Sequence, residues 1–187
     1  MSLHCMIDLE TLGNSHDAAI IQIGWCLFDQ EKIFESGQRT VHFEDALKHG
    51  KVTPSTLAWW MQQSEEARKS VITPHKNDTL AVALQAFVQT LENRWGKEEH
   101  NGQRVEHFWA HATFDFTILS NAFKSVGIEN PIGFRQCRDL RTLDMLADAA
   151  TIENWPVREG VHHTAIDDAV HQAKCVQLML KKINWRG

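Results

Sequence analysis

The chain has 187 residues, of which 43% are hydrophobic, and a formal net charge of −5 at pH 7. A chain of this length can bury a substantial core, and we expect one domain spanning residues 1–187. The acidic charge argues against a protein that binds polyanions through a uniformly basic face.

The four cysteines, at positions 5, 26, 137 and 175, include no Cys-x-x-Cys pair. This scatter argues against a zinc ribbon or a disulfide framework and favours reduced thiols in the cytoplasm. The chain also has no basic segment leading into an apolar run at its N-terminus and no stretch of ~18 apolar residues. We therefore expect a cytoplasmic protein with no membrane partner.

Residues 3–11 have the character of a buried strand, and they include two acids, Asp8 and Glu10. Side chains alternate along a strand, so the two carboxylates share one face while Ile7 and Leu9 face the other way. Neighbouring acids raise each other's pKa unless a cation lies between them, and hard ions such as Mg²⁺ prefer carboxylate oxygen. Taken alone, Asp-x-Glu recurs by chance in most chains of this size.

Two further strands are predicted after a polar turn at residues 13–17. Residues 18–28 are almost continuously apolar, which is typical of a central strand covered on both faces. Residues 33–43 mix apolar and polar side chains, which suits an edge strand. Together with residues 3–11 they predict an antiparallel meander.

Helices are expected next, the first beginning at Thr53 as N-cap with Pro54 at the first helical position. It carries Trp59 and Trp60, which either stack on the bases of a single strand or anchor the helix to the core. We favour the core. Ser64 is expected to cap another helix, and residues 78–95 show helical spacing that ends at Gly96, followed by a polar loop over residues 97–104.

Asp115 lies where a predicted strand, residues 105–110, passes into a helix that ends at Gly127. That position is at the carboxyl edge of the sheet, where open α/β sheets place their sites. An acid near a helix N-terminus is also favourable for dipole reasons alone. Taken singly, the second explanation is preferred.

The last third of the chain predicts a short strand at residues 136–140, a helix at 142–150 and a mobile loop at 151–160. A final helix follows. His163 stands just before this helix, and Asp168 lies about one turn inside it. The helix can therefore hold a carboxylate at the sheet edge while the loop brings an imidazole over it.

Three motifs in this order, Asp8-x-Glu10, Phe114-Asp115 and His163-x-Ala165-x-x-Asp168-Ala169, resemble those of the DEDDh 3′-5′ exonucleases of the ribonuclease-H-like superfamily. The resemblance covers the whole chain. Residues 53–60 and 138–143 are similar to the phage-type exonuclease and mycobacterial 3′-5′ exoribonuclease branch. The implied fold is α/β, with a mixed central sheet of a three-strand antiparallel meander plus parallel strands, flanked by helices.

The resemblance also implies roles for individual residues. Asp8, Glu10, Asp115 and Asp168 would hold two divalent ions, Mg²⁺ or Mn²⁺, and His163 would act as the general base. The alternative register of His162 with Asp167 has the same spacing, but only His163 with Asp168 places alanine at the third motif position. The candidate substrate contacts are Thr11, Leu12, His111 and Arg158.

His111 departs from the family pattern, because many members carry asparagine four residues before the second-motif aspartate. This departure concerns a secondary contact and not the metal ligands. The expected activity is removal of 5′-monophosphates from a free 3′ end of single-stranded DNA or RNA. The alternatives are a nucleic-acid-binding module that lacks the chemistry and a dimeric ribonuclease that trims RNA 3′ ends. The sequence leaves open the sugar preference and whether the chain forms a homodimer.

Overall fold

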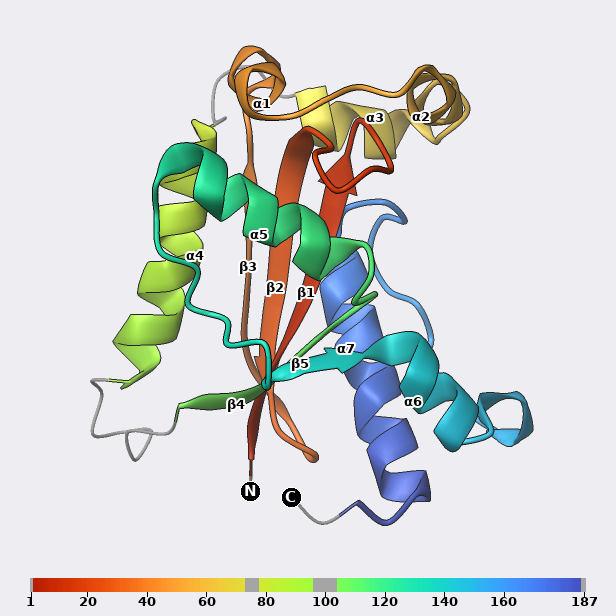
Figure 1. Ribbon diagram of the computed structural model, residues 1–187. Helices are drawn as coiled ribbons and strands as arrows, with labels where there is room; N and C mark the ends of the chain where they lie inside the picture. Colours follow the sequence, from red (N-terminus) through yellow and green to blue (C-terminus); the bar gives the residue numbers. More distant parts are fainter. Residues whose placement is uncertain (1, 73–77, 96–103, 186–187) are drawn as a thin grey trace.

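A single mixed sheet of five strands, in the order β3-β2-β1-β4-β5, forms the centre of the computed structural model (Figure 1). The structure describes residues 2–72, 78–95 and 104–185. Strand β1 pairs antiparallel with β2 and parallel with β4, β2 pairs antiparallel with β3, and β4 pairs parallel with β5. The predicted meander with added parallel strands is therefore confirmed. The strands are β1 (Leu3–Thr11), β2 (Ile20–Phe28), β3 (Ile33–Thr40), β4 (Val105–Ala110) and β5 (Cys137–Asp139).

Helices cover both faces of this sheet. In Figure 1, α4 and α5 lie on one side, α6 and α7 on the other, and α1 to α3 cross the end of the sheet far from the two termini. The helices are α1 (Phe43–His49), α2 (Pro54–Trp60), α3 (Glu65–Ile72), α4 (Leu80–Trp95), α5 (Asp115–Val126), α6 (Leu140–Leu146) and α7 (Ala165–Lys182), with a short 3₁₀ turn η2 (Ala149–Thr151).

Two hydrophobic layers follow from the two-residue period of the central strands. Ile7 and Leu9 of β1 belong to the layer that packs against α4 and α5. Met6 of β1 belongs to the opposite layer, beneath α7. Asp8 and Glu10 continue the Met6 side, so both carboxylates face α7. Strands β1 and β2 are buried along their full lengths, as their apolar character predicts.

The start of α7 lies directly against β2 at Gly24, because a residue with a Cβ would not allow so close an approach. A Cβ added to Gly24 would come within 2.2 Å of the Ala165 carbonyl. Two glutamine side chains of the sheet accept hydrogen bonds from the first amides of the helix: Gln22 Oε1 from Ala165 N (3.2 Å) and Gln38 Oε1 from Ile166 N (2.9 Å). These bonds satisfy amides that lack partners within the helix and set its position over the sheet.

Several boundaries differ from the sequence-based expectation; β2, for example, begins at Ile20 instead of residue 18. Strand β3 ends at Thr40 instead of residue 43, and Phe43 begins α1, a helix that was not predicted. Its N-cap is His42, whose ring accepts a hydrogen bond from Glu44 N (3.3 Å). Helix α6 begins at Leu140 and ends at Leu146, not at 142–150, because the Asp139 side chain accepts from Thr142 N and starts the helix earlier.

Other predicted helix ends are found where expected. Ser64 Oγ accepts from Ala67 N (3.1 Å), and Gly127 ends α5 in the left-handed region. Thr53 occupies the N-cap position of α2, although its side chain makes no capping hydrogen bond. Gly96 and nearly all of the predicted 97–104 loop lie outside the described residues.

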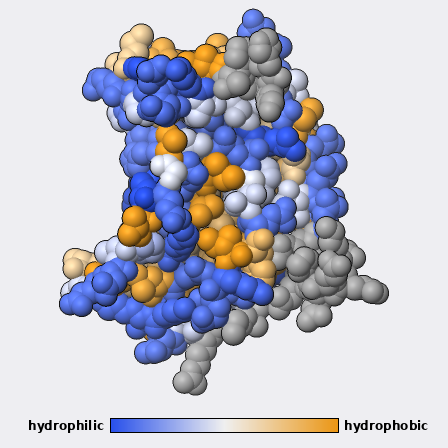
Figure 2. All heavy atoms as spheres, turned by 180° about the vertical axis from the view of Figure 1, so that it is seen from behind, coloured by the Kyte–Doolittle hydropathy of each residue, from blue (hydrophilic) through white to orange (hydrophobic). Residues whose placement is uncertain are grey.

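The reverse side of the molecule presents a mixed surface. Hydrophobic side chains gather in the middle of that face, and hydrophilic ones border them (Figure 2). Within residues 2–72, 78–95 and 104–185, no helix combines the length and apolar character needed to cross a membrane. All four cysteines are unpaired thiols.

Candidate active site

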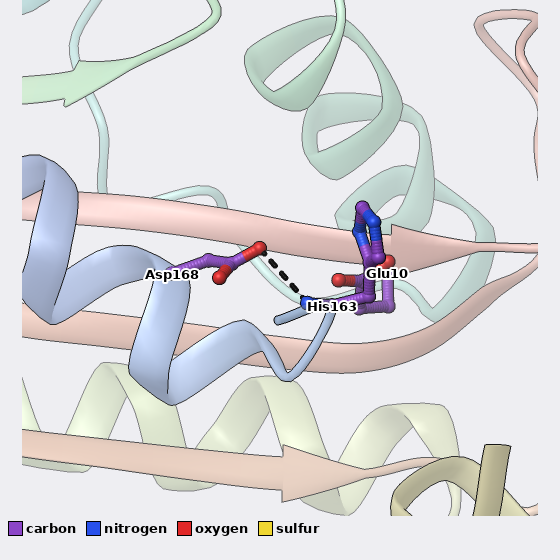
Figure 3. A group of neighbouring side chains, drawn as sticks. All are labelled: Glu10, His163 and Asp168. Carbon is purple, nitrogen blue, oxygen red and sulfur yellow. Dashed lines mark hydrogen bonds between the residues drawn. The ribbon is translucent and has the colours of Figure 1, made fainter. Parts of the chain in front are cut away.

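Two acids and a histidine from distant parts of the chain meet beneath the start of α7. One carboxylate oxygen each of Glu10 and Asp168 and one ring nitrogen of His163 all lie within 4.8 Å of one another. Figure 3 shows the three side chains, with Glu10 on β1, Asp168 on α7 and His163 in the segment leading into that helix. The Asp168 carboxylate also accepts a hydrogen bond from His163 N (3.3 Å). Packing of α7 on the sheet therefore joins the first and third motifs.

Asp115, the first residue of α5, is tied to the same strand. Its Oδ1 accepts a hydrogen bond from Leu9 N (3.2 Å), and its Oδ2 accepts from His111 N (2.9 Å). Leu9 lies between Asp8 and Glu10 in the sequence, so this hydrogen bond holds Asp115 close to the part of β1 that carries these two acids. The side chain is almost fully buried, and burial together with the charge of Asp8 raises the pKa of Asp115 well above its ordinary value.

The acids perturb one another strongly. Burial raises the pKa of Glu10 to about 9, and the charges of Asp8, Asp168 and Asp115 add to this effect. Burial and then the charge of Asp168 raise the pKa of Asp8 to about 7, against the opposing effect of a hydrogen bond from Gln172. Such shifts in neighbouring buried carboxylates mark a place where a cation would be stabilised.

The donor set fits divalent metal ions. Oxygen ligands suit hard cations such as Mg²⁺ and Mn²⁺, and a divalent ion would relieve the mutual repulsion that raises the pKa values of Asp8 and Glu10. The grouping of Glu10, His163 and Asp168 supplies carboxylate and imidazole groups that could bind such an ion. The residues that could hold the ions are Asp8, Glu10, Asp115 and Asp168.

In the presence of a chelator, we expect the free energy of unfolding to fall as the pH rises from 7 to 8.5. Asp8 and Glu10 have folded-state pKa values of about 7 and 9, above their ordinary values of 3.8 and 4.5. The folded protein therefore binds more protons than the unfolded chain in this window, and the slope is negative. A difference of one to two bound protons between the folded and unfolded states corresponds to a decrease in the free energy of unfolding of about 1–3 kcal/mol per pH unit. Urea unfolding followed by circular dichroism measures this slope.

Two controls isolate the acid cluster. The window begins at pH 7 because buried His4, with a folded pKa of about 4, contributes an opposite slope up to its ordinary value of 6.5. Saturating Mg²⁺ should flatten the slope, since the ion replaces the protons. The double variant Asp8→Asn with Glu10→Gln should reduce it without Mg²⁺, leaving the part due to Asp115 and the buried thiols, whose pKa values are also raised. A stability that is constant or rises over the window in wild-type protein with chelator would contradict the clustering.

His163 adopts an unusual backbone conformation. Its φ is 63°, in the left-handed region that non-glycine residues rarely occupy. This conformation turns the ring toward Glu10, and its centroid lies 4.6 Å from that of Trp59 in an edge contact. Burial, followed by the nearby charge of His162, lowers the pKa of His163. The imidazole is therefore neutral at pH 7 and able to accept a proton.

The two adjacent tryptophans have different surroundings. Trp60 is buried and donates a hydrogen bond from Nε1 to the Thr11 carbonyl (2.9 Å), so the packing interpretation is right for this residue. Trp59 remains 39% exposed and lies beside His163. Trp60 therefore anchors α2 to the end of β1, and Trp59 forms part of the wall next to the imidazole.

The four candidate substrate contacts lie around this cluster. Thr11 and Leu12 are buried at the end of β1, and the Thr11 hydroxyl donates to the Gly13 carbonyl (2.6 Å). The half-buried ring of His111 has no partner for Nδ1 among the described residues. Arg158 forms an ion pair with Asp168. His111 is thus next to Asp115, and Arg158 is next to Asp168. Thr11 and Leu12 lie at the end of β1, the strand that carries Asp8 and Glu10.

Sequence reasoning missed two side chains that position the site. Gln172 donates to Asp8 Oδ1 (2.8 Å). The signal that could have revealed it is its spacing of four residues from Asp168, which puts both on one face of α7. Asp139 accepts from Ala112 N (3.1 Å) and so holds the turn that precedes Asp115. No spacing rule links Asp139 to Ala112, because the contact depends on the pairing of β4 with β5.

The protein is a 3′-5′ exonuclease of the DEDDh type. The chain belongs to the family of the 3′-5′ exoribonuclease Rv2179c-like domain, which matches residues 3–180. It is also 28% identical to an exodeoxyribonuclease of Enterobacteria phage T4, over 94% of this chain and 86% of the relative. The predicted branch of the family is thereby confirmed.

Solved structures show the same fold at low sequence identity. Cell-death related nuclease 4 superposes with a TM-score of 0.67 at 19% identity, covering 96% of this chain and 64% of that nuclease. The nuclease domain of 3′hExo, a DEDDh family member solved with rAMP, gives 0.62 at 12% identity, covering 96% and 92%. Exonuclease I of E. coli, solved with an oligonucleotide, gives 0.62 at 15% identity, covering 97% and 41%. The chain thus spans less than two thirds of two of these proteins.

Proposed function

We propose that this exonuclease hydrolyses single-stranded DNA or RNA from a free 3′ end and releases nucleoside 5′-monophosphates. The observation that carries the proposal is the convergence of the acids. Asp8 and Glu10 come from β1, Asp115 from the start of α5 and Asp168 from the start of α7, and each raised pKa among them has another of these acids as a cause. Four unpaired thiols favour the cytoplasm as its compartment.

Two divalent ions, Mg²⁺ or Mn²⁺, fit this donor set, and when bound they supply positive charge to activate water and to neutralise the phosphate. Asp8 would help to hold the ions, because it interacts electrostatically with each of the other three acids. Glu10 and Asp168 would complete the site nearest His163, and Asp115 would hold the second ion. Gln172 would orient Asp8 through its 2.8 Å hydrogen bond.

His163 would serve as the general base. Its ring nitrogen lies within 4.8 Å of a carboxylate oxygen of Glu10 and of Asp168, so it would be able to accept a proton from a water held by ions on these acids. A lowered pKa keeps the ring neutral at pH 7, and its left-handed backbone holds it over the carboxylates. Proton acceptance is then the step that this side chain performs.

Thr11 and Leu12 would hold the terminal nucleotide, because they follow Asp8 and Glu10 at the end of β1. His111 and Arg158 would contact the strand on either side of the acids. The choice between RNA and DNA depends on a contact to the 2′-hydroxyl. The family description names an exoribonuclease, whereas the phage T4 relative is an exodeoxyribonuclease, so both sugars belong in the test.

Two alternatives remain distinguishable by experiment. A binding module without chemistry is disfavoured because all five positions carry groups able to perform the reaction. A dimeric ribonuclease that trims RNA ends would prefer a duplex with a short 3′ overhang over a plain single strand. Size-exclusion chromatography with light scattering would report the homodimer.

The test is digestion of matched 5′-labelled single-stranded RNA and DNA, each with a free or a phosphate-blocked 3′ end, in Mg²⁺, Mn²⁺ or chelator. We expect a ladder that shortens from the free 3′ end, nucleoside 5′-monophosphates as products, and no digestion with chelator. Internal cleavage of the blocked strand would indicate an endonuclease and overturn the proposal. Tight binding of all strands without any product would favour the binding module.

A further inference from the structure

Asp168, one of the proposed ion ligands, is already engaged by a cation of the protein itself. Its Oδ1 pairs with the Arg158 guanidinium, and its Oδ2 accepts a hydrogen bond from His163 N (3.3 Å, Figure 3). The carboxylate is 9% exposed and the Arg158 side chain 32% exposed, so a buried acid is paired with an arginine on a solvent-exposed segment. Both oxygens of Asp168 are thus held by residues of the segment between η2 and α7.

Arg158 also acts on Asp8, the acid next to Asp168 in the cluster. Its positive charge lowers the pKa of Asp8 and opposes the charge of Asp168 there. A divalent ion bound to Asp168 would lie within a few ångströms of this guanidinium, and two cations at that separation in a poorly solvated site repel strongly. Arg158 and the ion therefore require the same carboxylate and exclude each other from it.

We propose that Arg158 is an internal competitor of the divalent ion at Asp168, so that ion binding releases the arginine and with it the hold on the segment that carries His163. The inference rests on the proposed function, because it takes Asp168 as an ion ligand. The competition is reciprocal: the free energy of the Arg158–Asp168 ion pair weakens ion binding, and ion binding weakens the ion pair by the same amount. The released guanidinium becomes available to the phosphates of the bound strand, as its bidentate geometry suits.

The first test measures Mn²⁺ affinity from the electron paramagnetic resonance signal of free Mn²⁺. Arg158→Gln should lower the apparent dissociation constant by about fivefold or more, within the usual range of coupling between sites. Lys174→Gln is the matched control. Lys174 pairs with Glu159, the next residue of the same segment, so the variant removes an equal charge nearby without touching Asp168. Its affinity should match that of the wild type.

The second test reports the release directly. Trypsin cleaves after arginine, and pairing with Asp168 protects Arg158. Adding Mn²⁺ to the wild type should increase cleavage after Arg158 several-fold, as measured by mass spectrometry. Cleavage after the exposed Arg135 serves as the internal reference for the activity of trypsin.

The outcomes distinguish a failure of the proposed ion site from a failure of the proposed competition by Arg158. If the wild type binds no Mn²⁺, the proposed function fails at its ion site. If the wild type binds Mn²⁺ but Arg158→Gln binds it no more tightly, the competition is refuted while the ion site stands. Equal gains in Arg158→Gln and Lys174→Gln would reveal a general field effect and also refute it. Unchanged or reduced cleavage after Arg158 on adding Mn²⁺ would show that the arginine is not released.

Discussion

We expect Asp8→Asn to reduce the Mg²⁺-dependent digestion of single-stranded nucleic acid by at least about 10³-fold, because it removes a charged ligand placed among the other acids. Loss of an outer contact to a metal site typically costs only ~10–100-fold, and a direct ligand should cost more. The side chain keeps its shape, and Oδ1 still accepts from Gln172. The initial rate of shortening of a 5′-labelled oligonucleotide measures the effect.

Asp29→Asn is the matched control for this variant. Asp29 is also a buried aspartate, placed at the far end of β2, where its Oδ1 accepts hydrogen bonds from Glu31 N and Lys32 N (both 2.8 Å). Asparagine can keep both bonds. The control should retain activity, and Asp8→Asn should keep the far-ultraviolet dichroism of the wild type. Digestion at the wild-type rate by folded Asp8→Asn would show that the site has been misplaced.

His163→Asn should lower the rate by about 10²–10⁴-fold, the usual contribution of a positioned acid or base. Asparagine tolerates the left-handed conformation found at this position, so the backbone has no reason to change. Because burial lowers the pKa of His163, the wild-type rate should be level near pH 7 and fall only as the pH drops below the ordinary histidine value of about 6.5. With Mg²⁺ saturating over the whole pH range, so that protons do not displace the ions from Asp8 and Glu10, the variant should lack this acidic limb.

Two comparisons establish what His163 does. His162→Asn changes the exposed neighbour and should preserve the rate near pH 7, with the acidic limb moved to slightly higher pH because the charge of His162 lowers the pKa of His163. Mn²⁺ affinity distinguishes a base from a ligand, because one ring nitrogen of His163 lies within 4.8 Å of the Glu10 and Asp168 oxygens. A base leaves the affinity unchanged when removed. A marked loss of Mn²⁺ binding in His163→Asn would instead make the imidazole an ion ligand.

Local patterns predicted the elements of the fold with few errors. The continuous apolar run of β2 and the mixed character of β3 follow from how many faces of each strand are covered. The errors lie at boundaries, as at α1 and α6, where a single capping side chain moves the start of a helix. His42 and Asp139 perform that role through one hydrogen bond each, which periodicity does not report.

The motifs named the acids, but the contacts between them depend on packing over long stretches of sequence. Alternation along β1 predicts that Asp8 and Glu10 share a face, since it involves neighbours only. Whether Asp168 reaches them depends on the approach of α7 to Gly24, 144 residues from Asp168 in the sequence. The pairing of Arg158 with Asp168 depends on the path of an irregular segment.

Local patterns in the sequence therefore predicted the strands and most helix ends, because these depend on side-chain periodicity, and the family resemblance supplied the mixed sheet and the candidate acids and histidine. The different surroundings of Trp59 and Trp60, the support from Gln172 and Asp139, and the engagement of Asp168 by Arg158 became visible only in three dimensions. The reason is that each is a contact between elements, and its free energy depends on how helices and strands lie against one another, which no local pattern encodes.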